Sequence, residues 1–335
     1  MLPNTFGIDA SCDRYISVTS LSQLKQLLLD GTLAQTPLFI LGGGSNVVLP
    51  DHYEGTILHL DTKGISVNDD VEDASHLFVT AQAGENWNDF VLTCCRNGWY
   101  GLENLAAIPG SVGAAPVQNV GAYGLEAKDV ISSVKAYELS SGQERVFTPA
   151  ECVFGYRTSV FKTSLANRYV VSEVTFRLSL QFIPDLSYKA LSEAVQREKT
   201  QHDRPLDALA LVDIITRLRW SKLPRPEELG SCGSFFKNPV ISKTHLDRLL
   251  KLYPEMPSYA VAPDLFKIPA AYLIDHAGWK GRRIGPVGIY EKQALVLVNY
   301  GGATSVDVRR LAEAVINDVK ALYGVTLNPE AIFVE

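Results

Sequence analysis

The chain has 335 residues, of which 46% are hydrophobic and 20% are charged. This length predicts about two or three domains, and the composition excludes a wholly disordered protein. The 31 Lys and Arg residues against 37 Asp and Glu give a formal net charge of −6, which argues against a non-specific nucleic-acid binder because such proteins need a basic surface.

Segment 1–7 has neither the basic start nor the apolar core of a signal peptide. No stretch approaches the roughly 18 uninterrupted apolar residues of a membrane span. The cysteines form no C-x-x-C pair and stand at Cys12, Cys94, Cys95, Cys152 and Cys232. We therefore expect a cytoplasmic protein with reduced thiols, without membrane insertion and without a metal site.

The first half of the chain predicts strands interrupted by two helices. Apolar residues that fall on one face indicate the first helix, and Gly31 and Gly98 are suitable stops for the two helices. The predicted elements, in chain order, are a helix at 20–31, an apolar strand at 37–41, an extended run at 47–49, strands at 56–60 and 77–81, a helix at 87–97, and strands at 131–139 and 169–182.

The second half begins with a helical region at 187–220. Its end is basic and contains prolines (217–226), which predicts a domain boundary there. The elements predicted beyond it are helices at 243–252, 269–277 and 305–322 and strands at 293–299 and 331–334.

Three glycines, Gly42, Gly43 and Gly44, follow the first apolar strand and are succeeded by Ser45 and Asn46. Successive glycines permit left-handed backbone and close approach, so their N–H groups can converge on a phosphate. A dinucleotide fingerprint should open a helix, whereas an extended run follows here, which disfavours a Rossmann site. From these residues alone, a tight turn without a ligand is an equal alternative to a phosphate cradle.

A second irregular segment, 101–124, is rich in Gly, Ala, Pro and Asn and shows no clear period. Such a long irregular stretch inside a compact domain is usually functional. Its small residues would let a flat ligand lie against the backbone, and Ser111, Gln118 and Asn119 offer polar contacts. A loop packed between two sheets is the alternative. The glycine run in the same half of the chain favours the ligand.

Taken together, these motifs resemble one enzyme family, the UDP-N-acetylenolpyruvoylglucosamine reductases (MurB), over nearly the whole chain. The matching segments occur in the expected order. They are Asn4–Gly7, Gly42–Asn46, Gly101–Ala106, Ile108–Gly113, Gln118–Gly124, Phe154–Arg157, Gly233–Pro239 and Pro329–Glu330.

The resemblance implies an α+β protein, in which a two-subdomain FAD-binding fold of the PCMH/vanillyl-alcohol-oxidase-like type is followed by a C-terminal α+β substrate-binding domain. The expected boundaries are 1–66 for FAD-binding subdomain 1, 67–220 for subdomain 2, to which the C-terminal strand 326–335 returns, and 221–325 for the substrate-binding domain. FAD is expected to bind non-covalently to the motif residues Gly42, Gly43, Gly44, Ser45, Asn46, Pro109, Gly110, Ser111, Gly113, Gln118, Asn119, Gly121, Ala122 and Tyr123.

The resemblance also implies the reaction. NADPH reduces FAD and leaves, and a hydride then passes to the enolpyruvyl double bond of UDP-N-acetylglucosamine enolpyruvate, giving UDP-N-acetylmuramate for peptidoglycan synthesis. Arg157 matches the residue that stabilises the developing enolate, Ser234 matches the proton donor, and Glu330 matches a carboxylate that orients the reacting group. Cys232 lies near Ser234, and the sequence leaves open a contribution from it.

Only five residues follow Glu330, so its position depends on whether 331–334 pair into a sheet. The residues expected to bind substrate are Tyr156, Tyr188, Lys222, Asn238 and Gln293. A basic group around Lys222, namely Arg217, Arg219 and Arg225, would draw in the diphosphate, and a solvated helix end is the alternative for the three arginines.

Two other functions compete with this one. Another flavin oxidase or dehydrogenase could share the FAD-binding half, but many of these tether flavin through His or Cys, and segment 109–124 contains no His. A non-catalytic protein that binds flavin or a nucleotide-sugar would not need Arg157, Ser234 and Glu330 together. The expected partners are therefore the enolpyruvyl nucleotide-sugar and NADPH, with no nucleic acid, and the chain is expected to be a monomer.

Overall fold

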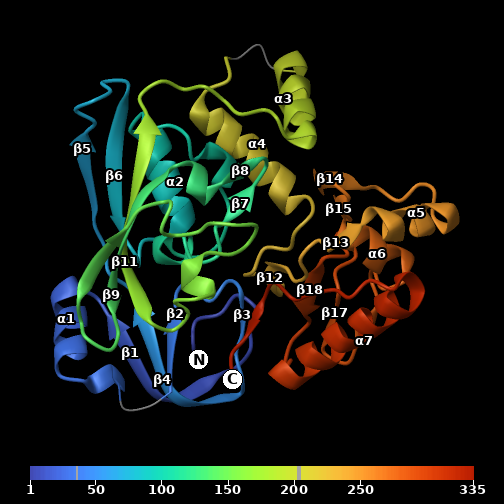
Figure 1. Cartoon of the computed structure of the whole chain (residues 1–335), viewed down its shortest axis with the longest axis horizontal. Coiled ribbons are helices and arrows are strands. Elements are labelled where there is room, and N and C mark those ends of the chain that lie inside the picture. The colour runs from blue at the N-terminus through green and yellow to red at the C-terminus, as the bar shows by residue number, and fades with distance from the viewer. Residues whose placement is uncertain (35–36, 202–204) are drawn as a thin grey trace. The chain divides into compact units, whose positions relative to one another are not determined.

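A computed structural model describes residues 1–34, 37–201 and 205–335. The chain divides into two compact units (Figure 1). Unit 1 comprises Met1–Ser11, Gly44–Tyr53 and Trp220–Glu335, and unit 2 comprises Cys12–Gly43 and Glu54–Arg219. Residues 1–66, expected to form one subdomain, are thus shared between the two units. The chain leaves unit 2 for the last time after Arg219.

Unit 2 holds a three-stranded sheet of order β1-β4-β2, an antiparallel five-stranded sheet of order β10-β9-β11-β6-β5 and the short pair β7-β8. The strands are β1 (Ser11–Val18), β2 (Leu38–Leu41), β4 (His52–Leu60), β5 (Ile65–Asp69), β6 (His76–Gln82), β7 (Gly121–Ala122), β8 (Leu125–Glu126), β9 (Ile131–Glu138), β10 (Glu144–Phe147) and β11 (Tyr169–Ser179). The helices are α1 (Leu21–Leu29), α2 (Trp87–Arg96), α3 (Lys189–Gln201) and α4 (Ala208–Trp220).

The core of unit 2 lies where α2 packs on the five-stranded sheet (Figure 1). The rings of Trp87 and Phe90 on α2 contact Phe176 on β11, with centroid separations of 5.9 and 5.0 Å, and all three side chains are buried. Burial of such aromatic groups is a main source of stability. The indole Nε1 of Trp87 also donates to the carbonyl of Leu105 at 2.9 Å, which attaches the irregular segment to this core.

Unit 1 holds an antiparallel sheet of order β12-β18-β17-β16, a second sheet of order β13-β15-β14 and the pair β19-β3. Helix α7 packs against β17, and α6 packs against α7 (Figure 1). The elements are β3 (Val47–Val48), β12 (Gly230–Ser234), β13 (Val240–Ser242), α5 (Lys243–Leu252), β14 (Tyr259–Ala262), β15 (Leu265–Lys267), α6 (Ala270–His276), β16 (Arg283–Ile284), β17 (Val287–Ile289), β18 (Val296–Asn299), α7 (Ser305–Tyr323) and β19 (Ile332–Phe333).

The C-terminal strand of unit 1 is firmly held. Strand β19 pairs in parallel with β3, with Ile332 opposite Val47, and the carboxylate of Glu335 accepts from Arg309 on α7 at 2.6 Å. The sheet pairing expected for 331–334 is therefore confirmed. The strand partner lies in segment 44–53 of unit 1, whereas the C-terminal segment was expected to return to residues 67–220.

Most predicted elements are confirmed, with three differences. The helical region at 187–220 consists of two helices, α3 and α4, and residues 202–204 lie outside the described part of the chain. Strand β18 begins at Val296 rather than at 293, because the Val296 N–H donates to the carbonyl of Gln293 at 3.1 Å in a turn. Strand β11 ends at Ser179. Among the described helices, none is long and apolar enough to cross a membrane.

Candidate functional site

The predicted site residues fall in both units. Unit 2 contains Gly42, Gly43, Pro109, Gly110, Ser111, Gly113, Gln118, Asn119, Gly121, Ala122, Tyr123, Tyr156, Arg157 and Tyr188. Unit 1 contains Gly44, Ser45, Asn46, Lys222, Ser234, Asn238, Gln293 and Glu330. The structure groups them as two sets, which we describe in turn.

In unit 2 the two glycine-containing loops touch through their backbones. A Cβ atom added to Gly43 would lie 2.8 Å from the Cα of Gly110, and one on Gly42 would lie 2.7 Å from the Oγ of Ser111. A Cβ on Gly113 would lie 2.5 Å from the Cβ of Ala83. Glycine is therefore required at Gly43 for the two loops to approach, whereas the contact at Gly42 is with a hydroxyl that can rotate away. The surface that the loops form is largely backbone.

Several residues of this set have left-handed backbone although they are not glycine. The φ angles are 47° at Asn119, 49° at Tyr123 and 55° at Arg157. Such conformations cost free energy and cluster at functional sites, where the surrounding structure holds them in place.

The side chain of Asn119 is fully buried and is engaged within unit 2. Its Nδ2 donates to the carbonyl of Gly155 at 3.1 Å and to Glu126 at 2.9 Å, and its Oδ1 accepts from the N–H of Lys128 at 3.0 Å. The amide therefore fixes the loop that carries the predicted FAD contacts, and Asn119 supports that loop from inside the protein.

Arg157 is placed by a hydrogen bond to the same segment. Its Nη2 donates to the carbonyl of Gly121 at 2.6 Å, and its guanidinium lies 5.5 Å from the ring centre of Tyr156. A second arginine, Arg219, is electrostatically coupled to Arg157. Burial lowers the pKa of Arg219, Tyr123 opposes this shift, and the charge of Arg157 adds to it. Arg219 thus brings positive charge to Tyr123, and Arg157 lies near enough to Arg219 for their charges to interact.

Arg219 was expected to be one member of a basic group and not a site residue in its own right. The sequence feature that could have indicated Arg219 as a site residue is its position on α4, between the apolar residues Leu218 and Trp220. Such a residue can turn its charge into the protein rather than to solvent, and the structure shows that it does.

The substrate tyrosine predicted for this unit, Tyr188, lies against Tyr123. Their ring centres are 5.4 Å apart with planes at 90°, a favourable edge-to-face arrangement. Tyr188 is 45% exposed, and desolvation raises the pKa of Tyr123. The half-buried Tyr123 ring thus supports an exposed Tyr188 ring that can contact a ligand.

In unit 1, Ser234 and Glu330 lie on neighbouring segments although they are far apart in sequence. The N–H of Glu330 donates to the carbonyl of Phe235 at 2.7 Å, and Phe236 forms a bridge with Pro329. The rings of Phe235 and Phe236 are buried, whereas Ser234 is exposed at the end of β12. The two phenylalanines anchor the strand and leave the Ser234 hydroxyl accessible.

The amide of Asn46 connects the glycine run of unit 1 to Glu330. Its Nδ2 donates to the carbonyl of Glu330 at 3.3 Å, and its own carbonyl accepts from the N–H of Ile332 at 3.0 Å. A predicted FAD-binding residue and a predicted catalytic residue are therefore in direct contact.

Cys232 is a poor alternative to Ser234. Its residue is 5% exposed. Burial raises the pKa of its thiol to about 12, and the charge of Glu330 acts in the same direction. The thiol stays neutral at physiological pH and does not face solvent, whereas the Ser234 hydroxyl does.

The other substrate residues predicted in unit 1 occupy loops near these strands. Lys222 is exposed in the turn after α4. The Oδ1 of Asn238 accepts from the N–H of Ala270 at 2.9 Å, which leaves its Nδ2 as the group that could donate to a ligand. Gln293 precedes β18, whose Val296 pairs with Ser234.

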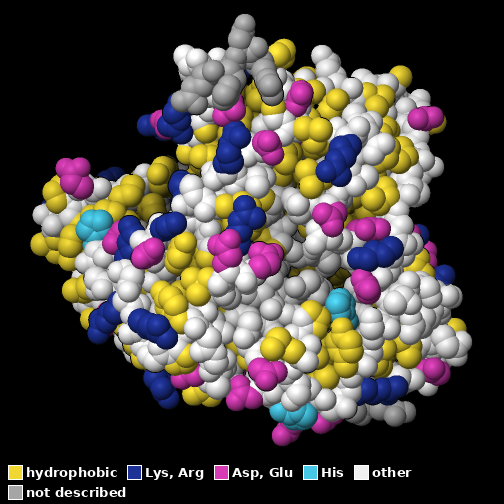
Figure 2. Space-filling model, turned by 180° about the vertical axis from the view of Figure 1, so that it is seen from behind, with side chains coloured by type: hydrophobic (Ala, Val, Ile, Leu, Met, Phe, Trp, Pro, Cys, Tyr) yellow, Lys and Arg dark blue, Asp and Glu magenta, His cyan; other side chains and the backbone are white. Residues whose placement is uncertain are grey.

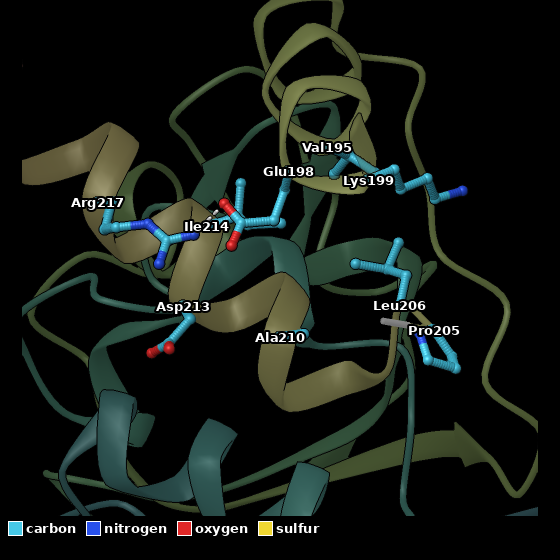
Figure 3. Close-up of a pocket in the computed structure, with 9 residues that line it drawn as sticks. All are labelled: Val195, Glu198, Lys199, Pro205, Leu206, Ala210, Asp213, Ile214 and Arg217. Carbon is cyan, nitrogen blue, oxygen red and sulfur yellow. Dashed lines mark hydrogen bonds and ion pairs between the residues drawn. The ribbon is translucent and has the colours of Figure 1, made fainter. Parts of the chain in front are cut away.

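Arg217 does not join these groups. It lies on α4 and pairs with Glu198 of α3 at 2.7 Å, beside a cavity of about 270 Å³ that Val195, Lys199, Pro205, Leu206, Ala210, Asp213 and Ile214 also line (Figure 3). The Arg217 side chain is 58% exposed in the last turn of α4, which agrees with the solvated helix end given above as the alternative.

No group of three His, Cys, Asp or Glu side chains suited to a metal ion occurs within residues 1–34, 37–201 and 205–335. On the face drawn in Figure 2, the described Lys and Arg side chains are interspersed with Asp and Glu and do not gather into one basic field. The positive charge beside Tyr123 is therefore a local feature.

The residues present in unit 2 fit a flavin dinucleotide. The close approach of Gly43 to Gly110 leaves a surface of peptide groups with few side chains, and Tyr123, with its left-handed backbone, is partly exposed in the same set of residues. Peptide N–H groups suit a pyrophosphate, and an open backbone surface suits a flat ring system.

Comparison with known proteins agrees with this fit. Residues 12–147 match the family model described as "FAD binding domain", which confirms the predicted FAD-binding half, and residues 225–334 match "UDP-N-acetylenolpyruvoylglucosamine reductase, C-terminal domain". A solved structure of MurB from Thermus caldophilus is similar in fold, with a TM-score of 0.65 and 22% identity, over 99% of this chain and 96% of that one.

Curated relatives match over nearly the full length. The UDP-N-acetylenolpyruvoylglucosamine reductase of Bdellovibrio bacteriovorus is 45% identical over 98% of this chain and 96% of its own. The enzyme of the same name from Amoebophilus asiaticus is 41% identical over 99% of this chain and 96% of its own. The predicted α+β fold and the predicted enzyme class are thereby confirmed, and the chain belongs to the UDP-N-acetylenolpyruvoylglucosamine reductase family.

Proposed function

We propose that this chain reduces the enolpyruvyl double bond of UDP-N-acetylglucosamine enolpyruvate to give UDP-N-acetylmuramate, with NADPH as the reductant. Family membership supports the reaction, and the contact between the Ser234 and Glu330 segments is the observation that carries the assignment of residues. The chain acts as a cytoplasmic monomer. When bound, FAD supplies a carrier that accepts a hydride from NADPH and passes it on.

The residues around that carrier have separate tasks. In unit 2, Gly42, Gly43 and segment 109–123 hold the cofactor by their backbone, and in unit 1 Gly44, Ser45 and Asn46 do so. Lys222 and the Nδ2 of Asn238 bind the nucleotide-sugar, and Tyr156, Tyr188 and Gln293 complete its binding residues.

Arg157 and Ser234 perform the chemistry on the substrate. Addition of hydride to the terminal carbon of the double bond places negative charge on an enolate conjugated with the substrate carboxylate. A permanently charged guanidinium stabilises that charge and matches the carboxylate geometry, and the bond from Arg157 to the carbonyl of Gly121 fixes its direction. The Ser234 hydroxyl then donates its proton to the neighbouring carbon.

Glu330 positions the reacting group in this proposal. Its backbone is held from two sides, by its own N–H to Phe235 and by its carbonyl to Asn46. A carboxylate on so well fixed a backbone segment can act with little loss of conformational entropy.

Anaerobic stopped-flow absorbance near 450 nm tests the proposal. NADPH should bleach the flavin, and UDP-N-acetylglucosamine enolpyruvate should restore the colour. Ser234→Ala should leave bleaching intact and slow turnover by about 10²- to 10⁴-fold, the usual contribution of a general acid.

Ser231→Ala in the same strand is the matched control, because its backbone, not its hydroxyl, makes the bonds to Thr5. Recovery of colour with oxygen but not with the enolpyruvyl substrate would indicate an oxidase instead. Impaired bleaching in Ser234→Ala would contradict the role given to the hydroxyl.

A further inference from the structure

We propose that Asn104 is a positioning residue that sets the place of the Tyr188 side chain beside Tyr123 through one buried amide group. The inference rests on the proposed function, because it takes Tyr188 to be a substrate-binding residue. Asn104 belongs to the Gly101–Ala106 motif, to which no role has been given so far. All the residues involved lie in unit 2.

The amide of Asn104 joins two segments that are far apart in sequence. Its Nδ2 donates to the carbonyl of Tyr123 at 2.9 Å and to the carbonyl of Asp185 at 2.9 Å. Both hydrogens of the amide nitrogen are therefore used, one for the flavin-binding segment and one for the segment that leads to Tyr188. Asn104 is 3% exposed, so its amide nitrogen reaches both carbonyls from inside the protein.

The Asn104 backbone is itself fixed. It lies in a short 3₁₀ helix, Glu103–Leu105, all of whose residues are buried. The next residue, Leu105, accepts the bond from the indole of Trp87 on α2. The amide is thus attached to a buried segment that is bonded to α2, and it can fix the positions of the two segments relative to that core.

Both acceptors lie at places where the backbone needs support. Tyr123 has left-handed backbone, with φ of 49°, which costs free energy unless neighbours hold it. Asp185 begins a tight turn in which its Oδ1 accepts from the N–H of Ser187 at 2.9 Å. A bond to each carbonyl opposes rotation of the adjacent peptide groups.

The two segments meet closely just beyond these bonds. A Cβ added to Gly124 would lie 2.8 Å from the Oγ of Ser187 and 4.0 Å from the Cβ of Tyr188. The rings of Tyr123 and Tyr188 make their edge-to-face contact at the same place. Release of the Asp185 carbonyl would therefore let the Tyr188 ring leave Tyr123.

Only a side chain with two donors on one atom suits this position. An aspartate of the same shape would place a carboxylate oxygen against two carbonyl oxygens, and alanine would remove the donor from both part-buried bonds. We expect Asn104→Ala to raise the KM for the enolpyruvyl substrate about tenfold, because two hydrogen bonds are lost, with the rate of flavin bleaching by NADPH unchanged.

The decisive readouts separate positioning from a general loss of structure. In a Tyr188→Ala background, Asn104→Ala should no longer change the KM, because coupled residues are not additive. Hydrogen exchange of peptide amides at 185–192 should be faster in Asn104→Ala, since the N–H groups of Leu191 and Ser192 bond to the carbonyl of Tyr188.

Asn97→Asp is the matched control. It also removes an amide donor, to the carbonyl of Thr93 at 2.8 Å, but on the exposed end of α2, so both readouts should stay at wild-type values. Asn104→Ser, which brings no charge to the position, is the second variant, should the alanine fail to fold.

Unchanged exchange at 185–192 would overturn the inference, as would a KM increase that persists without Tyr188. If the wild-type protein bleaches with NADPH but ignores the enolpyruvyl substrate, the proposed function fails, and hydrogen exchange alone then decides whether Asn104 holds the segment.

Discussion

Replacing Gly43 by alanine should weaken FAD binding without unfolding the protein. The added Cβ would lie 2.8 Å from the Cα of Gly110, whereas carbon atoms in good contact are about 3.5–4.0 Å apart. The carbonyl of Gly110 accepts from the N–H of Trp87 at 3.0 Å, so this loop is anchored to α2. The exposed loop at Gly43 must therefore move by roughly 1 Å.

The size of the effect follows from the cost of overpacking, which is about 1–3 kcal/mol. The proposed FAD contacts need the two loops at the approach that the structure shows, so the cost of restoring that approach is expected to reduce the affinity for FAD. This corresponds to a rise of about 5- to 150-fold in the dissociation constant of FAD. Titration of the apoprotein with FAD, followed by flavin fluorescence, measures it directly.

Gly31→Ala is the control, because nothing lies within 4 Å of a Cβ there although φ is +70°. This variant should lose stability through its backbone and keep the FAD affinity of the wild type. A Gly43→Ala protein with a normal circular dichroism spectrum and an FAD affinity within about twofold of wild type would refute the reasoning.

Two further predictions concern stability in unit 2. The buried Oγ1 of Thr62 has no hydrogen-bond partner among the described residues. Thr62→Val should therefore stabilise the protein by about 1 kcal/mol in chemical denaturation. Thr80→Val is the control and should not stabilise it, because it removes a 2.8 Å bond to a second threonine hydroxyl. Hydrogen bonds from Arg177 lower the pKa of Asp70 from 3.8, and Ser75 and Arg177 do the same for Asp73. A lowered folded-state pKa contributes stability above pH 3.8 that is lost as pH falls. Arg177→Gln should therefore be less stable than wild type near pH 7, and the difference in stability should vanish on acidification. An equal difference in stability at all pH values would contradict this prediction.

The long helices could be predicted because local signals define their ends. Helix α7, expected at 305–322, runs from Ser305 to Tyr323 between a Thr304–Asp307 capping box and the left-handed Gly324. Strand β12 could not be predicted, because Gly230–Ser234 has little intrinsic strand preference and is extended through its pairing with β18.

The site shows the same limit at the level of side chains. The motifs located the loops, but spacing cannot tell which polar groups are already used. Asn119 has its amide bonded inside the protein, and Arg217 pairs with Glu198. These outcomes depend on partners far away in sequence, so they emerge only when the tertiary structure is known.

The pairing of β3 with β19 also has a consequence for biosynthesis. Asn46, beside β3, contacts Glu330, which is 284 residues further along the chain. At roughly 5–20 residues per second, a ribosome needs about 15–60 s to make the intervening chain. During that time β3 has no sheet partner, and Asn46 lacks its bonds to Glu330 and Ile332. The flavin site proposed above, which includes Asn46, is therefore expected to be completed late, after synthesis of the segment that contains Glu330.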